Sequence, residues 1–240
     1  MKKNNVFQIP SFTTAQALLA LAVESERLKM ENLRMGEMMA KTILKALDCK
    51  DHYTFGHSMR VAYFSLVTGR ELGLSEFELR ELELSAIFHD VGKIGTPDNV
   101  LNKPSRLTEE EFLVMKKHPE LSYEILKEYP GLEKIAENAR LHHERFDGRG
   151  YPLGLKGDEI PLYARIILIA DTFDAMTSTR PYRKGLDYSV AYDELNQFSG
   201  SQFDPQCVKA FISGMAKEAQ KGEDEFHIPL MDQKFSKNAA

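Results

Sequence analysis

Apolar side chains recur at helical spacing along most of the chain. Residues 13–49 are rich in Ala, Leu, Met, Glu and Lys and contain no proline, which predicts one long helix or a helix pair broken near Gly36. The apolar run 166–169 resembles a strand, but its continuation through Phe173 and Met176 favours a buried helix. The pattern therefore predicts an all-α fold.

Capping residues and prolines mark the predicted helix boundaries. The capping-box sequences Ser75–Glu78 and Thr108–Glu111 each begin a helix, and Asp204–Pro205 supplies an N-cap followed by a proline in the first turn of another. Four further prolines are expected to separate helices: Pro104, Pro130, Pro152 and Pro161. These boundaries divide the chain into a series of helices of ordinary length.

Three segments are expected: an N-terminal helical segment over residues 1–48, one domain over 49–219, and a polar, loosely held tail over 220–240. In the first segment, Leu21, Leu28 and Met35 only loosely follow a heptad. That helix could pack on the domain, or it could form a coiled coil with a second copy or a signalling partner.

Composition limits the classes of function. The chain has 240 residues, 42% of them hydrophobic, and a net charge of −5, which argues against a nucleic-acid polymer as partner. The apolar run Ala17–Val23 is too short to span a membrane, and no signal peptide is recognisable. Cys49 and Cys207 are far apart and are expected to be ordinary buried thiols in a reducing cytoplasm.

A set of histidines and aspartates indicates metal chemistry. Imidazole and carboxylate are typical ligands of divalent iron, manganese and zinc. Adjacent pairs can reach two ions because successive helical residues diverge by about 100°. The set is too large for one metal and suits two: His57, His89, Asp90, His118, His142, His143 and Asp171. His52 and His227 are interpreted as ordinary core or surface residues.

The donor types narrow the choice of metal. No cysteine is close to the set in sequence, so a thiolate site is not favoured, and Mg²⁺ would prefer more carboxylates. Two divalent ions against two carboxylates and five neutral imidazoles leave a charge of about +2, which a phosphodiester could neutralise. We expect two divalent ions, with Fe or Mn favoured over Zn.

Several motifs around these residues resemble the bacterial HD-GYP domains, a branch of the HD phosphohydrolase superfamily. The matching stretches are HDVGKIGTPDNVL at 89–101, HHERFDGRGYP at 142–152, residues 154–183 and GSQFDP at 200–205. The resemblance covers about residues 51–211. It implies an all-α metal phosphodiesterase that linearises cyclic di-GMP to pGpG, with GMP as a further product left open; some members accept related cyclic dinucleotides.

The resemblance also implies a division of the ligands. The first metal would be held by His57, His89, Asp90 and Asp171; Asp90 would bridge to the second, which His118, His142 and His143 complete. Some members bind a third metal through a glutamate at the position of Tyr53, and tyrosine cannot replace it. The family more often has glycine at the position of Ser122, so this serine could reshape the entrance to the site.

The expected mechanism uses a hydroxide that bridges the two ions, because the metals lower the pKa of bound water toward 7. This hydroxide would attack phosphorus in line. Asp90 holds the metals together, and Lys93, one turn further on, would protonate the leaving 3′-oxygen or ease its charge.

The segment Gly150–Pro152 follows two of the proposed ligands and could form one wall of the site. By resemblance, Tyr151, Arg180 and Arg183 contact the substrate. A tyrosine offers a ring for stacking, and the two arginines are suited to phosphate or guanine acceptors. Asp147 and Asp174 are expected to orient other side chains or cap a helix rather than to bind metal.

Two other functions share these ligands. An HD-fold diiron oxygenase would use a similar ligand set, and a non-catalytic module would bind the cyclic dinucleotide or a partner protein without turnover. Lys93, the segment with Tyr151 and the paired arginines favour hydrolysis over the oxygenase. The complete ligand set argues against a module without activity.

Overall fold

The computed structural model describes residues 12–50, 52–179, 184–221, 225–228 and 233–236. Among them the long helices α1 and α2 are followed by α3 and a set of shorter helices. The α-helices are α1 (Phe12–Lys50), α2 (His52–Glu71), α3 (Glu76–Phe88), α4 (Asp98–Leu101), α5 (Glu109–Met115), α6 (His118–Leu126), α7 (Glu133–Leu141), α8 (Leu162–Thr177), α9 (Tyr188–Gln197) and α10 (Pro205–Gln220). Two 3₁₀ helices, η1 (Val91–Gly95) and η2 (Gly157–Glu159), lie between them. The predicted all-α fold is confirmed.

The core is built around α2, which contacts α1, α3, α8 and α10. From His57 to Gly69 every residue of α2 is buried, as expected for a helix surrounded by others. Three rings join α2, α8 and α10: the ring centroids of Phe64 and Phe173 are 5.1 Å apart, and those of Phe173 and Phe211 are 4.8 Å apart, both edge to face. The apolar run 166–169 lies in α8 and is helical, as predicted.

The predicted helix starts are confirmed. The Ser75 and Thr108 side chains each accept a hydrogen bond from the backbone three residues on, and both capping boxes are complete. Asp204 accepts from the backbone N–H of Gln206 at the start of α10.

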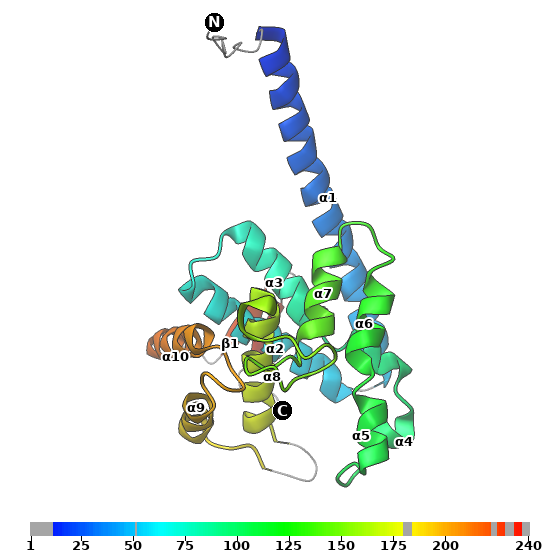
Figure 1. Ribbon diagram of the computed structural model, residues 1–240, viewed down its shortest axis with the longest axis vertical. Helices are drawn as coiled ribbons and strands as arrows, with labels where there is room; N and C mark the ends of the chain where they lie inside the picture. Colours follow the sequence, from blue (N-terminus) through cyan, green and yellow to red (C-terminus); the bar gives the residue numbers. More distant parts are fainter. Residues whose placement is uncertain (1–11, 51, 180–183, 222–224, 229–232, 237–240) are drawn as a thin grey trace, which may run out of the picture.

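Helix α1 is continuous, so no break occurs at Gly36. Its first turns project away from the body of the molecule, and its later turns lie against the body (Figure 1). Gly36 is buried there, and a Cβ at this position would lie 3.0 Å from Cδ2 of Leu132. In the projecting part every residue from Thr14 to Glu31 is exposed.

In the segment predicted as a polar, loosely held tail, the structure describes residues 225–228 and 233–236, and these are paired rather than loose. Strands β1 (Glu225–Ile228) and β2 (Gln233–Ser236) form an antiparallel pair in which Glu225 is opposite Ser236. Strand β1 also contacts α2. The polar composition of the tail hid the pairing, because a two-stranded ribbon needs little apolar sequence of its own when it packs on a helix. Within the described ranges, no helix is long and apolar enough to cross a membrane.

Candidate metal centre

The seven predicted ligands come from widely separated parts of the fold and converge. His57 lies on α2, His89 is the C-cap of α3, and Asp90 is the N-cap of η1. The others come from the start of α6, the end of α7 and the middle of α8. Their donor atoms form three groups, each within 4.8 Å: His118 with His142 and His143, His57 with His89 and Asp171, and His89 with Asp90 and His142.

Asp90 lies between two sets of imidazoles. Its Oδ2 is 3.2 Å from Nε2 of His89 and 3.6 Å from Nε2 of His57. Its Oδ1 is 3.1 Å from Nε2 of His118 and 3.9 Å from Nε2 of His142. Each carboxylate oxygen therefore faces a different pair of histidines, as a bridging carboxylate must.

Four of the imidazoles are held from behind through Nδ1. This atom lies 2.6 Å from the carbonyl oxygen of Ala86 in His89, 2.8 Å from that of Met115 in His118, and 2.7 Å from that of Ala139 in His142. In His57 the partner is a carboxylate, Asp174. Such contacts fix the ring and direct Nε2 into the centre, which is how metal-binding histidines are usually oriented.

Asp174 is itself held in place by Arg60. The Arg60 Nε donates to Oδ1 of Asp174 at 2.5 Å, and Nη2 donates to Oδ2 at 3.1 Å. The guanidinium and the carboxylate are both buried. Asp174 therefore orients His57, as expected for it. Asp147 instead pairs with Arg145 and does not reach the centre.

The electrostatics of the metal-free protein leave most donors able to bind a cation. Burial lowers the pKa of His142 well below its usual value, and burial with the nearby His118 lowers that of His143 to about 3. Burial raises the pKa of Asp90, but His89 and Lys93 outweigh it and hold the pKa well below its usual range. His57 differs: burial lowers its pKa, yet hydrogen bonds to three carboxylates raise it well above the usual value.

Two buried atoms of the centre support a bound cation. Among the described residues, Nε2 of His89 and Oδ1 of Asp90 make no hydrogen bond, although Oδ2 of Asp90 lies 3.2 Å from the first atom and Nε2 of His118 lies 3.1 Å from the second. Leaving buried polar atoms without a partner is costly, and a metal ion would remove that cost. The donor set is nitrogen and oxygen only, which fits divalent iron, manganese or zinc.

The turn that carries His89 and Asp90 packs closely against α6 and is hydrogen-bonded to it. A Cβ on Gly92 would lie 2.1 Å from the carbonyl oxygen of His118, so only glycine allows this approach. The buried hydroxyl of Ser122 accepts from the N–H of Gly92 at 2.9 Å and donates to the carbonyl oxygen of His89 at 3.0 Å. Ser122 thus fixes the turn from beneath rather than shaping an entrance, because its side chain is not exposed.

The loop after α7 brings Tyr151 to the centre. A Cβ on Gly150 would lie 2.3 Å from the backbone nitrogen of Arg145, so glycine is required at this close crossing. The Tyr151 ring stacks on His143 with centroids 4.8 Å apart, and the Lys116 ammonium lies 4.8 Å from the centroid of the Tyr151 ring. Burial raises the pKa of Tyr151, so its hydroxyl stays protonated at neutral pH.

The remaining predicted residues differ in how far the structure describes them. The ammonium of Lys93 contacts Oδ2 of Asp90. Arg180 and Arg183 lie outside the described residues, and so does the Tyr53 side chain, although its backbone belongs to α2. The roles of the seven histidines and aspartates as metal ligands, of Lys93 as catalyst, and of Tyr151, Arg180 and Arg183 as substrate contacts stay predictions.

Sequence reasoning missed two residues near the centre. Arg60 follows His57 by three positions on α2, a spacing that places both on one face, but a single arginine in a helix gives no reason to expect burial. Lys116 precedes His118 by two positions. Nothing in the sequence around it predicts its contact with the ring of Tyr151, 35 residues further along.

Comparison with known proteins identifies the family and the fold of the chain. The family model described as the HD domain matches residues 41–207. The chain is 41% identical to the cyclic di-GMP phosphodiesterase response regulator RpfG of Xanthomonas campestris, over 85% of this chain and 53% of that protein. It is 42% identical to a cyclic di-GMP phosphodiesterase of Thermotoga maritima (74% and 50%), and 42% identical to the 3′3′-cGAMP-specific phosphodiesterase 1 of Vibrio cholerae (76% and 43%).

The chain spans about half the length of these relatives. Among solved structures, a cyclic GMP-AMP specific phosphodiesterase of V. cholerae superposes with a TM-score of 0.56 at 25% identity, covering 77% of this chain and 49% of that one. The HD domain of the L. monocytogenes phosphodiesterase PgpH superposes with a TM-score of 0.54 at 20% identity, covering 78% and 99%, which shows a shared fold.

Proposed function

The chain belongs to the HD domain family, in its HD-GYP branch, and on that premise we propose that it hydrolyses cyclic di-GMP to linear pGpG in a metal-dependent reaction. The observation that carries the proposal is the position of Asp90, whose two oxygens face different pairs of histidines. The names of the relatives support a cyclic dinucleotide as substrate.

We propose two divalent ions, Fe or Mn before Zn. His57, His89 and Asp171 would hold the first ion, His118, His142 and His143 the second, and Asp90 both. The grouping of the donor atoms supports this division. When bound, such a pair supplies water activation and charge stabilisation for attack on phosphorus.

The chain's own residues have separate tasks in this scheme. The contacts to Nδ1 keep the imidazoles rigid, so the positions of their Nε2 atoms are set before substrate arrives. Lys93 is half-buried: its ammonium contacts Asp90, and its side chain keeps 24% of its exposure. An ammonium there can reach a substrate and ease the developing charge on the leaving 3′-oxygen.

Tyr151 is proposed to contact the substrate together with Arg180 and Arg183. Its half-buried ring is held by the stack on His143, and its protonated hydroxyl can donate to a phosphate oxygen. Lys116, packed over the same ring, adds positive charge on this side of the centre. A dianionic substrate would be attracted to that charge.

The test is anaerobic incubation of the full chain with Fe²⁺ or Mn²⁺ and, separately, cyclic di-GMP and 3′3′-cGAMP, with products followed by chromatography. Metal-dependent formation of pGpG is expected. Cleavage of 3′3′-cGAMP alone would correct the substrate. No product from either, despite two metals per chain by elemental analysis, would overturn the proposal in favour of the diiron oxygenase or the non-catalytic module.

We also propose that the projecting part of α1 binds a second copy of the chain or a signalling partner. Leu18, Leu21 and Leu28 are 57%, 68% and 49% exposed, which is unusual for leucines along one side of a helix. The measured mass in solution tests the homodimer: wild type should exceed one chain, and a variant with Leu21→Lys and Leu28→Lys should not.

A further inference from the structure

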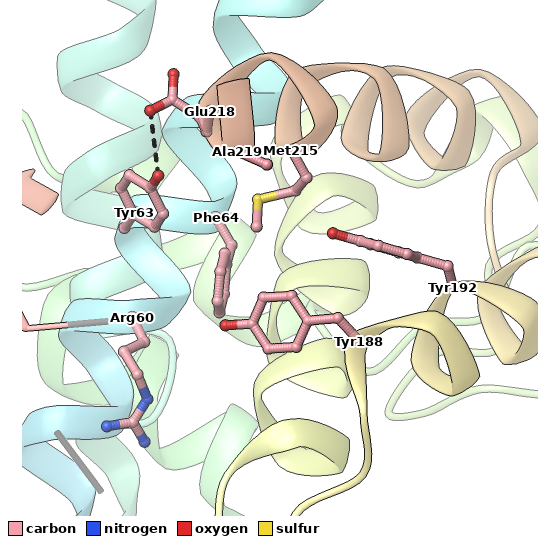
Figure 2. Close-up of a pocket in the computed structure, with 8 residues that line it drawn as sticks. All are labelled: Arg60, Tyr63, Phe64, Tyr188, Tyr192, Met215, Glu218 and Ala219. Carbon is pink, nitrogen blue, oxygen red and sulfur yellow. Dashed lines mark hydrogen bonds between the residues drawn. The ribbon is translucent and has the colours of Figure 1, made fainter. Parts of the chain in front are cut away.

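A cavity of about 110 Å³ lies between α2, α9 and α10 (Figure 2). Its walls are aromatic: Tyr63 and Phe64 come from α2, and Tyr188 and Tyr192 from α9. Met215 of α10 closes one side. None of these residues belongs to the proposed ligand set or to the proposed substrate contacts.

Buried side chains form the inner walls of the cavity, and the cavity opens to solvent beside Tyr188. Tyr63, Phe64 and Met215 are 5%, 4% and 7% exposed, whereas Tyr188 is 41% exposed. A concave aromatic surface with a rigid base and an open rim is typical of a small-molecule site. Its volume encloses about one aromatic ring, and a second, fused ring would lie at the open rim beside Tyr188.

Polar groups at the two ends restrict the chemistry of such a molecule. Figure 2 shows Glu218 and Arg60 at opposite ends of the row of rings. Glu218 accepts hydrogen bonds from the Tyr63 hydroxyl at 3.2 Å and from the Lys221 ammonium at 2.6 Å, and its carboxylate oxygens can each accept a second one. The Arg60 guanidinium is neutralised by Asp174. Because Lys221 neutralises Glu218 and Asp174 neutralises Arg60, an ion would meet no unpaired counter-charge at either end, whereas a neutral ring with an N–H or O–H donor to Glu218 fits.

The cavity is connected to the candidate metal centre. Arg60 lines the cavity and donates to Asp174, and Oδ2 of Asp174 lies 2.7 Å from Nδ1 of His57. Two contacts therefore separate the cavity from a proposed metal ligand. A molecule that packs against the Arg60 side chain would restrict it, and with it the orientation of His57.

We propose that this cavity binds a small neutral aromatic molecule carrying one N–H or O–H donor, and that Arg60 and Asp174 couple its occupancy to metal binding at His57. The molecule is an effector, because it occupies a site other than the one proposed for the cyclic dinucleotide. The coupling must be reciprocal: bound metal and bound aromatic molecule raise each other's affinity by the same factor.

Binding is tested on the metal-free full chain by calorimetry with indole, which is flat, neutral and has one N–H donor. Saturable binding with a Kd below about 1 mM is expected. Ala219 lines the cavity, so Ala219→Phe should fill it and weaken binding at least tenfold. Ala216 is exposed on the same helix and does not line the cavity, so Ala216→Phe is the matched control and should bind indole like wild type.

Three results would overturn the site: no saturable binding, equal weakening by both variants, or tighter binding of benzyltrimethylammonium than of indole. The coupling is tested by measuring Mn²⁺ affinity with and without saturating indole. A severalfold gain in wild type that is lost in Ala219→Phe is expected. Indole binding that leaves Mn²⁺ affinity unchanged would refute the coupling. Both readouts are independent of phosphodiester hydrolysis, so they stand or fall separately from the proposed function.

Discussion

Oδ2 of Asp174 lies 2.7 Å from Nδ1 of His57, deep beneath the candidate metal centre. This contact holds the imidazole with Nε2 toward Asp90 and Asp171. Replacing Asp174 with asparagine removes the negative charge behind the ring and keeps the shape of the side chain. We expect metal affinity to fall about 10–100-fold, the usual cost of losing a partner that orients a ligand.

Metal affinity of Asp174→Asn is measured by competition with a chromogenic chelator. Asp158→Asn is the control, since the Asp158 side chain is 93% exposed and pairs with Arg165, which is not a proposed ligand. Equal affinity of Asp174→Asn and wild type would show that Asp174 does not orient a ligand.

Asp90→Asn should lose most bound metal, because an amide cannot give a charged oxygen to each of two ions. Elemental analysis should give fewer than one metal per chain, against about two in wild type. Hydrolysis of cyclic di-GMP should fall by about 10³-fold or more, as for the loss of an essential group. Retention of two metals per chain would contradict the bridging role.

Tyr151→Phe should keep both metals and weaken the handling of substrate. The ring can still stack on His143, whereas the hydroxyl that would donate to phosphate is lost. An increase in KM of about tenfold is expected, the scale of one hydrogen bond to a charged group. Tyr129, 36% exposed, supplies the control Tyr129→Phe. Unchanged kinetics in Tyr151→Phe would remove it from the substrate contacts.

Gly92→Ala should unfold the turn that carries Asp90. The added methyl would lie 2.1 Å from the carbonyl oxygen of His118 and 2.5 Å from the backbone nitrogen of Ser122. We expect the free energy of unfolding to fall by about 3 kcal/mol or more, measured in urea. Gly73→Ala is the control: it has a φ of +78° and no atom within 4 Å of the new methyl, and should cost about 1–2 kcal/mol. Similar losses in both variants would contradict the close approach.

Asp147 should contribute stability that depends on pH. The hydrogen bonds from Arg145 lower the pKa of Asp147 to about 2, below its unfolded value. A depressed folded pKa stabilises the protein above about pH 4, and this contribution is lost as the pH falls toward 2. In urea, Asp147→Asn should be less stable than wild type at pH 7, and the difference should shrink at pH 3. A difference that does not change with pH would exclude the ion pair as its cause.

The helices could be predicted from sequence because their signals are local. The capping boxes at Ser75 and Thr108 lie within four residues of chain, and the burial of 166–169 follows from its own composition. The pairing of β1 with β2 could not be predicted, because it and the contact of β1 with α2 depend on the tertiary fold.

In the candidate centre too, residues with a local motif could be predicted, and residues placed by the tertiary fold could not. His89 and Asp90 could be named from their motif, and the structure brings them beside His57 and Asp171. The buried Arg60 could not, because its burial depends on Asp174, 114 residues away in sequence. A role of Ser122 at the entrance is compatible with its sequence position, because that position does not reveal that its hydroxyl points inward to Gly92.

The most direct test is anomalous diffraction from crystals of the chain loaded anaerobically with Mn²⁺. We expect two anomalous peaks that share Asp90, one beside His57 and His89 and the other beside His118 and His142. A single peak, or two peaks of which only one contacts Asp90, would contradict the dinuclear centre.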